Sequence, residues 1–197
     1  MIWEKPMISY GQERPFDKAQ VEALLDAAFG PDRFNKSSYS LRDNVDPIAK
    51  LSRVARLDGR IVGTIRYWPI VVRDLLRGTD SEALLLGPLA VAPAMHSAGI
   101  GGELMRMSLA AASEAGHKRI LLVGDIGYYS RFGFKNVLPN YITMPGGRDA
   151  RRLLVKQSAA MPSLPAVGKI LPAAPQGMPA VPGMLGTYDR GLPVAAA

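Results

Sequence analysis

The sequence predicts a single α/β domain built around a mixed sheet, and three observations support this. The length of 197 residues suits one domain. Leu51–Leu57 and Arg60–Val72 are apolar segments joined by an Asp-Gly dipeptide, which is typical of a β-hairpin. Ala83–Val91 and Arg119–Val123 flank a helical segment, as in a right-handed crossover between parallel strands.

The N-terminal part predicts a strand followed by two helices. Ile2–Tyr10 is a candidate strand, which Pro6 would confine to a sheet edge. Asp17 is a candidate N-cap for the first helix, which Gly30-Pro31 ends. Its apolar residues recur at helical spacing, namely Val21, Leu24, Leu25 and Ala28. A second, short helix is expected over Lys36–Asn44.

The middle of the chain predicts the core of the sheet. Pro69 is expected to mark a bulge or bend in its strand, and Arg73–Glu82 is a polar connection. Ala83–Val91 is apolar throughout, as a central strand would be. The turn His96–Gly102 leads into a helix that ends near Gly116. The inward stripe of this helix is expected to comprise Leu104, Met107 and Ala111.

The C-terminal part predicts a division of the chain. Tyr128–Phe132 suggests a short helix, and Phe134–Tyr141 begins a last strand or two. From Ser158 the composition shifts to Pro, Ala, Gly and Met, which do not sustain a regular element for long. We therefore expect a domain over residues 1–157 and an extended or partly disordered tail over 158–197.

Composition excludes several kinds of site. The chain has no cysteine, which excludes disulfides, thiolate metal sites and cysteine nucleophiles. Its two histidines, His96 and His117, make a histidine-based metal centre unexpected. Residues 1–150 hold 19 basic and 16 acidic side chains, which suits an anionic nucleotide ligand without indicating nucleic acid. No apolar run is long enough to span a bilayer and no secretory signal is apparent, so we expect a cytoplasmic protein.

The segment Leu84–Leu104 combines an apolar strand, a glycine-rich turn and the start of a helix. Gly99, Gly101 and Gly102 carry no Cβ, so backbone N–H groups of the turn can converge on an anion. The helix adds unpaired N–H groups and the positive end of its dipole. The segment therefore predicts a phosphate-binding turn, although a plain strand–helix turn can require the same small residues.

Two familiar nucleotide-binding motifs do not fit this turn. A P-loop requires Gly-Lys-Ser/Thr at the helix start, where this chain has Gly101-Gly102-Glu103. A dinucleotide fingerprint belongs to a first strand–helix unit, with an acidic residue about 20 positions further on. This turn follows a meander in the middle of the chain, and Asp125 falls in the wrong context for that role.

A second group of residues follows the next strand, in the sequence GDIGYYSRFGF from Gly124 to Phe134. Tyr128 and Tyr129 are expected to emerge beside the strand that precedes the glycine-rich turn. A tyrosine at this place can donate a proton to a leaving thiolate. Ordinary packing of two amphipathic aromatic side chains is the alternative interpretation.

Together, these segments resemble the GNAT superfamily of acyl-CoA-dependent N-acyltransferases, and over roughly Ile8–Met144 they are similar to its YhbS-like branch. The cofactor signature Gln/Arg-x-x-Gly-x-Gly/Ala corresponds to HSAGIG at His96–Gly101, with histidine replacing the first Arg or Gln. The family's Tyr-x-x-x-Gly-Phe element matches at Tyr129–Phe134. The resemblance implies the GNAT fold, a mixed central sheet of about six to seven strands, flanked by helices and splayed between two central parallel strands.

The resemblance also implies roles for individual residues. The implied co-substrate is acetyl-CoA or another acyl-CoA, and no metal is implied. Leu89, Ala90 and Val91 would pair with the pantetheine arm through their backbone, and an N–H near Leu89 or Ala90 would polarise the thioester carbonyl. The cofactor-binding turn would comprise His96, Ser97, Ala98, Gly99, Ile100, Gly101 and Gly102, with the N–H groups of Ser97–Gly102 on the pyrophosphate. Tyr129 would protonate the departing thiolate.

The general base is the least defined role. Many relatives carry a glutamate on the strand that holds the cofactor, but Leu84–Val91 contains no acidic residue. Asp125 is the best acidic candidate for the base, and an N-cap for the next helix is an equally good interpretation of this residue. A third alternative is a relay of water molecules without a dedicated base. Tyr39, Arg42 and the region around Trp68 would line the acceptor side in this fold, unless they serve ordinary packing.

The expected reaction is transfer of an acyl group, most simply acetyl, from acyl-CoA to a small-molecule or peptide primary amine by direct attack in a ternary complex. One alternative is an N-acyltransferase with a longer acyl chain on CoA or on acyl carrier protein. The basic run Arg148, Arg151, Arg152 and Lys156 would dock such a carrier, contact the CoA 3′-phosphate or simply be a solvated face. Another alternative is a non-catalytic CoA-binding sensor. The sequence leaves a homodimer open.

Overall fold

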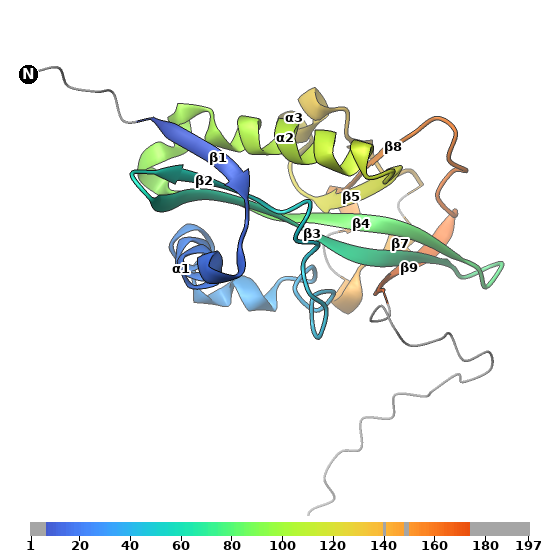
Figure 1. Ribbon diagram of the computed structural model, residues 1–197. Coiled ribbons are helices and arrows are strands. Elements are labelled where there is room, and N and C mark those ends of the chain that lie inside the picture. Colours follow the sequence, from blue (N-terminus) through green and yellow to red (C-terminus); the bar gives the residue numbers. More distant parts are fainter. Residues whose placement is uncertain (1–6, 140, 148–149, 174–197) are drawn as a thin grey trace, which may run out of the picture.

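The computed structural model describes residues 7–139, 141–147 and 150–173, within which nine strands form one mixed sheet (Figure 1). The strands are β1 (Ile8–Gln12), β2 (Arg53–Leu57), β3 (Arg60–Asp74), β4 (Asp80–Val91), β5 (Arg119–Val123), β6 (Lys135–Asn136), β7 (Tyr141–Thr143), β8 (Leu153–Gln157) and β9 (Val167–Pro172). The α-helices are α1 (Lys18–Phe29), α2 (Ile100–Glu114) and α3 (Ile126–Tyr129). Short 3-10 turns occupy Pro15–Asp17, Pro31–Asn35, Pro93–Ala98, Ser130–Phe132, Pro145–Gly147 and Ala150–Arg152.

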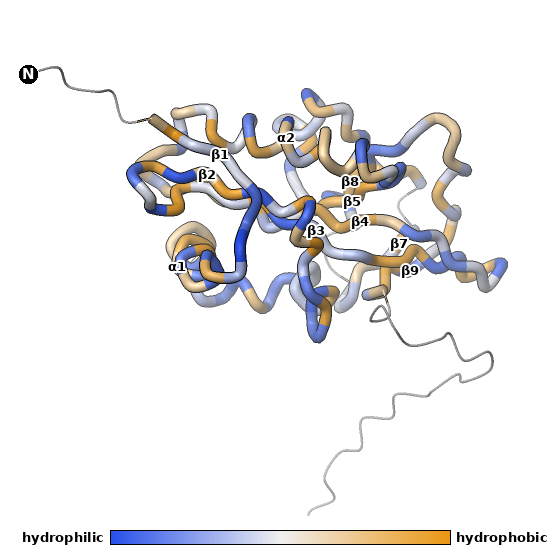
Figure 2. The backbone as a smooth tube through the Cα atoms, in the orientation of Figure 1, coloured by the Kyte–Doolittle hydropathy of each residue, from blue (hydrophilic) through white to orange (hydrophobic). Residues whose placement is uncertain are grey.

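The strand order is β1-β2-β3-β4-β5-β8-β6, and β9 pairs with the far half of β3 and with β7. Helix α1 covers one face of the sheet and α2 covers the other (Figure 1). The most hydrophobic stretches of chain include β4 and β5 in the middle of the sheet (Figure 2). These two strands run parallel and are connected by α2, so the predicted crossover and the flanked, mixed sheet are confirmed.

The predicted hairpin forms between β2 and β3. Its two turn residues, Asp58 and Gly59, have φ angles of 49° and 78°, the left-handed conformation that a two-residue turn of this kind requires. The bulge expected at Pro69 does not occur there, because Pro69 stays in register with Leu84 of β4. The predicted bulge at Pro69 is therefore wrong, whereas the alternative of a bend stays a prediction. The register irregularity between the two strands lies nearer the start of β3.

A bulge in β4 comprises Gly87 and Pro88, which together stand opposite Arg66 of β3. Because side chains alternate along a strand, the extra residue shifts which positions face α2. Before the bulge these are Leu84 and Leu86, and after it Leu89 and Val91 pack against the same cluster. The indole Nε1–H of Trp68 donates to the Gly87 carbonyl oxygen at 2.6 Å, which fixes the bulge from the α1 side.

The N-terminal elements differ from expectation in two places. Asp17 precedes α1, but its side chain does not cap that helix. Instead its buried carboxylate accepts from the Arg14 backbone N–H at 2.7 Å and pairs with Arg56 at 2.5 Å. The helix expected over 36–44 is a series of turns joined by i→i+3 backbone bonds. The strand expected from residue 2 is observed as β1, and residues 1–6 lie outside the described part.

Helix α2 buries a stripe that differs from the one predicted. Its buried residues are Ile100, Leu104, Met105, Ser108 and Ala112, whereas Met107 and Ala111 are half-buried. Ser108 lies on this inner face because its hydroxyl lies 3.0 Å from the Tyr67 hydroxyl, a buried hydrogen bond. A serine that is satisfied in this way is invisible to a pattern based on hydrophobicity.

The segment after Ser158 contributes a strand to the sheet. β9 pairs with Ile70–Asp74 of β3, and Gly168 fits this contact because a Cβ there would lie 2.9 Å from the Arg73 carbonyl oxygen. The predicted division at residue 157 stays a prediction, and residues 174–197 of the expected tail lie outside the described part. Among the described helices, none is long and apolar enough to cross a membrane.

Candidate active site

The site lies where β4 and β5 separate. The parallel pairing between them is limited to Leu84 with Ile120 and Leu85 with Leu121. Beyond this point β4 continues to Val91 while paired only with β3 on its other side. The edge of β4 that faces β5, including residues 89–91, is therefore free of a neighbouring strand. The predicted splay between the two central parallel strands is confirmed.

A cavity of about 370 Å³ occupies this separation. β4 contributes residues 85–89, the end of β5 and the turn after it contribute Val123–Asp125, and the segment after α1 contributes Lys36, Tyr39 and Arg42. Tyr129 closes the cavity from the side of α2. The cavity thus joins Tyr129 to the bulged part of β4.

The glycine-rich turn is built as the sequence suggests for an anion site. Gly99 adopts a left-handed conformation, with φ of 75°, at the N-cap of α2. The first backbone N–H to bond within the helix belongs to Glu103, which donates to the Gly99 carbonyl. The N–H groups of Ile100, Gly101 and Gly102 have no carbonyl partner within α2, and the dipole of this 15-residue helix favours negative charge there. Ser97 and Ala98 lie exposed just before this point.

His96, at the first position of the cofactor signature, is exposed and turned back toward β4. Its Nε2 lies 3.1 Å from the Val91 carbonyl oxygen, to which it donates in the tautomer protonated at Nε2. The side chain is therefore tied to the end of the strand. In this arrangement, any anion at the turn meets mainly backbone N–H groups.

Tyr129 is half-buried and packs against the core, and its ring lies directly over Gly124 at the end of β5. A Cβ on Gly124 would lie 2.3 Å from Cε2 of the tyrosine, so only glycine leaves room for the ring. The ring meets Tyr128 and Phe134 edge-on, with centroids 4.9 and 6.0 Å away. Burial, with a smaller contribution from Tyr128, raises the pKa of Tyr129 to about 12, against an opposing effect of Arg152. The hydroxyl is therefore protonated at neutral pH.

The two motif regions approach each other at Tyr128, the residue just before the Tyr-x-x-x-Gly-Phe element. A Cβ on Gly101, in the first turn of α2, would lie 3.1 Å from the Tyr128 hydroxyl oxygen. The glycine at this position therefore allows the tyrosine motif to approach the cofactor turn closely.

Asp125 caps α3, because its Oδ1 accepts from the Gly127 backbone N–H at 2.8 Å. The capping interpretation of this residue is thus confirmed. The same carboxylate is exposed and lines the cavity, so capping does not remove it from the site.

The acceptor-side candidates are brought together on the α1 side of the cavity. The Arg42 guanidinium lies over the Tyr39 ring at 4.2 Å and near the Trp68 ring at 5.5 Å. The residues of the basic run near the C-terminal end take different positions. Arg152 lines the cavity, Lys156 donates to the Phe132 carbonyl at 2.9 Å, and Arg148 lies outside the described part.

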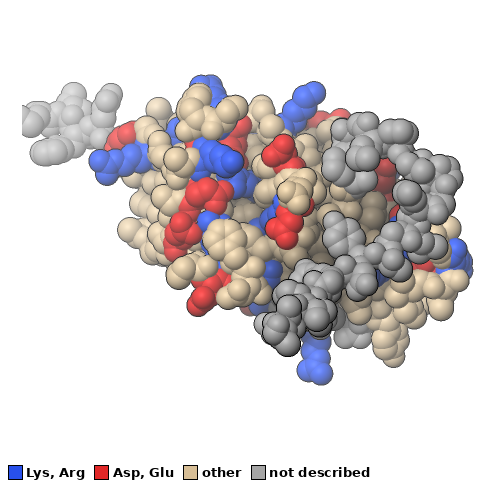
Figure 3. Space-filling model, turned by 90° about the horizontal axis from the view of Figure 1, so that it is seen from below, with Lys and Arg blue, Asp and Glu red and all other residues tan. Residues whose placement is uncertain are grey.

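Sequence reasoning missed an ion-pair cluster under the sheet. Arg66 is buried and pairs with Glu13 at 2.6 Å and Glu22 at 2.7 Å, and Glu22 also pairs with Arg33 at 2.7 Å. Figure 3, seen from the side of α1, shows acidic and basic side chains next to one another over this face. Glu13 and Arg66 are far apart in the sequence, so no local spacing could have indicated the pair.

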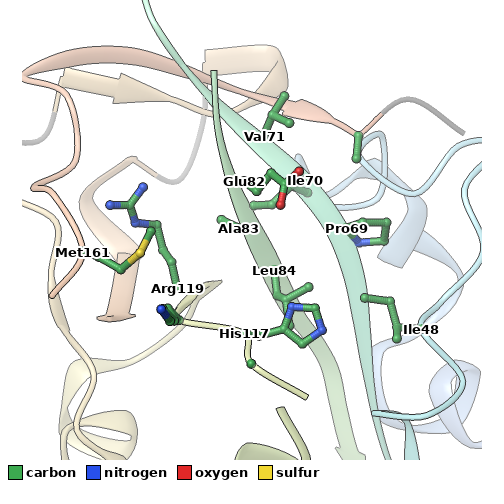
Figure 4. A pocket seen from close by; sticks show the side chains of 13 residues that line it. Ile48, Pro69, Ile70, Val71, Glu82, Ala83, Leu84, His117, Arg119 and Met161 are labelled. Carbon is green, nitrogen blue, oxygen red and sulfur yellow. The ribbon is translucent and has the colours of Figure 1, made fainter. Parts of the chain in front are cut away.

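A second cavity, of about 610 Å³, lies at the opposite ends of β4 and β5 (Figure 4). Arg119, Glu82 and His117 line it, and it contains neither of the two motifs. Separately, no group of three or more His, Asp or Glu side chains among the described residues is arranged to hold a metal ion.

Comparison with known proteins agrees with this geometry. The Acetyltransferase (GNAT) family matches the chain over residues 19–134. The uncharacterized N-acetyltransferase YhbS of Escherichia coli K12 is 32% identical over 124 residues, which are 62% of this chain and 71% of YhbS.

Two solved structures share the fold. A GNAT family acetyltransferase from Brucella melitensis, in complex with acetyl-CoA, is 29% identical with a TM-score of 0.61, over 86% of this chain and 98% of that one. Escherichia coli YhbS in complex with CoA is 24% identical with a TM-score of 0.69, over 86% of this chain and 92% of that one.

Proposed function

Because the chain belongs to the GNAT acetyltransferase family, we propose that it transfers an acetyl group from acetyl-CoA to a primary amine by direct attack in a ternary complex. The observation that carries this proposal is the open edge of β4, with a glycine-rich helix start at one end and a half-buried, protonated tyrosine across the gap. The Brucella melitensis relative, solved with acetyl-CoA, supports acyl-CoA as the co-substrate.

The geometry of β4 and α2 supports the following binding roles. The pantetheine arm pairs with the free edge of Leu89, Ala90 and Val91, as an added strand would. The pyrophosphate is held by the N–H groups of Ser97–Gly102. An N–H near Leu89 or Ala90 polarises the thioester carbonyl, and a fixed backbone donor of this kind needs no reorganisation during reaction.

The chemical roles fall to Tyr129 and Asp125. The amine attacks the thioester carbon, the carbon–sulfur bond breaks, and the Tyr129 hydroxyl gives its proton to the departing thiolate. Asp125 takes the proton of the attacking amine through water. Each proton transfer contributes on the order of 10²–10⁴-fold to the rate.

The test measures turnover with acetyl-CoA and a broad panel of amines. We expect Tyr129→Phe to lower kcat about 100-fold or more while the variant still binds CoA. Asp125→Asn keeps a good N-cap but removes the base, so it should lower kcat without lowering Tm, whereas Asp125→Ala should lower both. An unchanged kcat in Tyr129→Phe would exclude the acid role, and an unchanged kcat in Asp125→Asn would leave this residue as a cap only.

The same experiment addresses the donor and the competing functions. Octanoyl-CoA and acylated acyl carrier protein are compared with acetyl-CoA at equal concentration. Faster turnover with either would replace the acetyl assignment by a longer chain or a carrier-bound donor. If the protein binds CoA but acylates no amine, the alternative of a non-catalytic CoA-binding sensor would be favoured.

A further inference from the structure

Arg42 places a cation in the cavity, and no described carboxylate forms a salt bridge with it. Its Nε and Nη1 are buried and make no hydrogen bond. The guanidinium is held against the Tyr39 and Trp68 rings, and its Nη2 lies 3.6 Å from the position a Cβ would take on Gly87. The charge is therefore presented at the bulge of β4, within the space between the separated strands.

The surrounding residues leave this charge uncompensated. Arg66 is satisfied by Glu13 and Glu22, and Arg33 by Glu22 and Asp26. Among the described residues, none forms a salt bridge with Arg42. Burial is the main reason why the pKa of Arg42 falls to about 10. Tyr39 opposes this fall, repulsion from Arg66 and Arg33 adds to it, and the group stays charged at neutral pH.

A half-buried cation without a carboxylate partner is unfavourable, and stacking on the two rings does not by itself require a cation. Burying a charge costs free energy unless a counter-charge and hydrogen bonds accompany it. An apolar side chain could pack between the two rings without that cost. A guanidinium in this place is explained if a ligand brings the missing negative charge.

The remaining charges of the cavity favour an anionic ligand. Lys36 and Arg152 line it together with Arg42, and Asp125 is the acidic residue among its lining. Oδ1 of Asp125 is already engaged with a backbone N–H. A planar guanidinium is the side chain best suited to a carboxylate, and one guanidinium matches a single negative charge.

We propose that the amine acceptor carries a carboxylate, and that Arg42 binds this carboxylate while the amine faces the thioester. The proposal rests on the proposed acetyl transfer and names the substrate class for that site. The bulge lies directly before Leu89 and Ala90, where the thioester carbonyl is assigned. A molecule that bears both groups would therefore span from Arg42 to the reacting carbon along one short stretch of β4.

The test uses matched acceptors that differ only in charge. The full chain, with acetyl-CoA, receives glycine, 4-aminobutyrate and 6-aminohexanoate, each beside its uncharged amide. We expect at least one carboxylate to exceed its amide by about 10- to 100-fold in kcat/KM, the range for a hydrogen-bonded charge. Arg42→Gln should abolish this preference through the carboxylate's KM, with the amide changing little, and Arg42→Lys should retain part of it.

Two control variants separate a specific contact from a general effect. Arg77→Gln removes an exposed arginine from the β3–β4 turn, outside the cavity, and should keep the preference. Lys36→Gln removes a second charge from the cavity. If it weakened the preference as much as Arg42→Gln does, net charge rather than Arg42 would select the acceptor, and the proposal would be overturned. Thermal unfolding shows whether each variant is folded.

A binding measurement separates this proposal from the proposed function. Calorimetry compares butyrate, which has a carboxylate but no amine, with butyramide. If no amine is acetylated but butyrate binds more tightly than butyramide, and only when Arg42 is present, transfer is wrong and the carboxylate site stands. If amines are acetylated with no preference for carboxylates, or with one that survives Arg42→Gln, the transfer stands and the carboxylate site is wrong. If neither turnover nor butyrate binding is found, both are wrong.

Discussion

Replacing Gly124 by alanine tests whether the placement of Tyr129 controls activity. An added Cβ would lie 2.3 Å from Cε2 and 2.7 Å from Cδ2 of the tyrosine, and 2.9 Å from Cδ1 of Leu122. Carbon atoms in contact prefer about 3.5–4.0 Å, so the ring must move by roughly 1 Å. Gly124 does not adopt a positive φ angle, so an alanine at this position is unfavourable because of the steric overlap and not because of backbone strain.

The magnitude of both effects follows from that displacement. Overpacking of this kind costs about 1–3 kcal/mol, which in a chain of this size lowers Tm by roughly 2–4 °C per kcal/mol. A misplacement of about 1 Å in a reacting group can lower the rate about 100-fold. We therefore expect Gly124→Ala to lose both stability and kcat, with a rate loss no larger than that of Tyr129→Phe.

A double-mutant cycle shows whether the rate loss passes through the hydroxyl. In the Tyr129→Phe background the ring still occupies the same space, so Gly124→Ala should again lower Tm but should not lower kcat further. Gly11→Ala is the matched control, because a Cβ there meets only Nη1 of Arg56, at 3.7 Å. Urea unfolding and steady-state turnover measure the two effects. A second full rate loss in the Tyr129→Phe background would refute the reasoning, as would a Gly124→Ala variant with wild-type Tm and kcat.

Two further predictions concern the parts that support the cavity. Trp68→Phe removes the indole donor and leaves the Gly87 carbonyl unpaired, so the free energy of unfolding in urea should fall by about 1–3 kcal/mol. An unchanged value would mean that the rest of the sheet holds the bulge. For Glu22, burial acts to raise the pKa, but hydrogen bonds from its two arginine partners outweigh it and the pKa is lowered. The ionised Glu22 therefore stabilises the fold above the unfolded-state pKa of this residue, and this stabilisation is lost as pH falls through its folded-state pKa. Glu22→Gln should thus be less stable than wild type at pH 7, and the difference in unfolding free energy between the two should narrow below about pH 4. A difference that stays constant with pH would contradict this.

Features that depend on neighbouring residues could be predicted from the sequence. The Asp58-Gly59 hairpin, the crossover through α2 and the glycines at the start of that helix each carry a local signal that the structure reproduces. The bulge at Gly87-Pro88 carries a weaker one, because its position depends on pairing with β3 and on the indole of Trp68. Pro69 offered a stronger local signal but is accommodated without a bulge.

Features that depend on residues far apart in the sequence could not be predicted. β9 lies in a stretch rich in Pro, Ala and Gly, and it becomes a strand because β3 extends beyond β2 and offers a free edge. Arg42 was a candidate only because its segment flanks the acceptor side in related folds. Nothing near it in the sequence indicates that Arg33 and Arg66 would form ion pairs with Glu22 while Arg42 forms none among the described residues.

The two motifs form one packed unit, which explains why their combination is more informative than either alone. Gly101 lets the Tyr128 hydroxyl approach the first turn of α2, and Gly124 lets the Tyr129 ring lie over the end of β5. The rings of the two tyrosines then meet edge-on at 4.9 Å. These contacts link the turn that we propose to bind phosphate to the tyrosine that we propose as the acid. A glycine turn or a tyrosine that occurred alone would lack this coupling, and each has many other structural explanations.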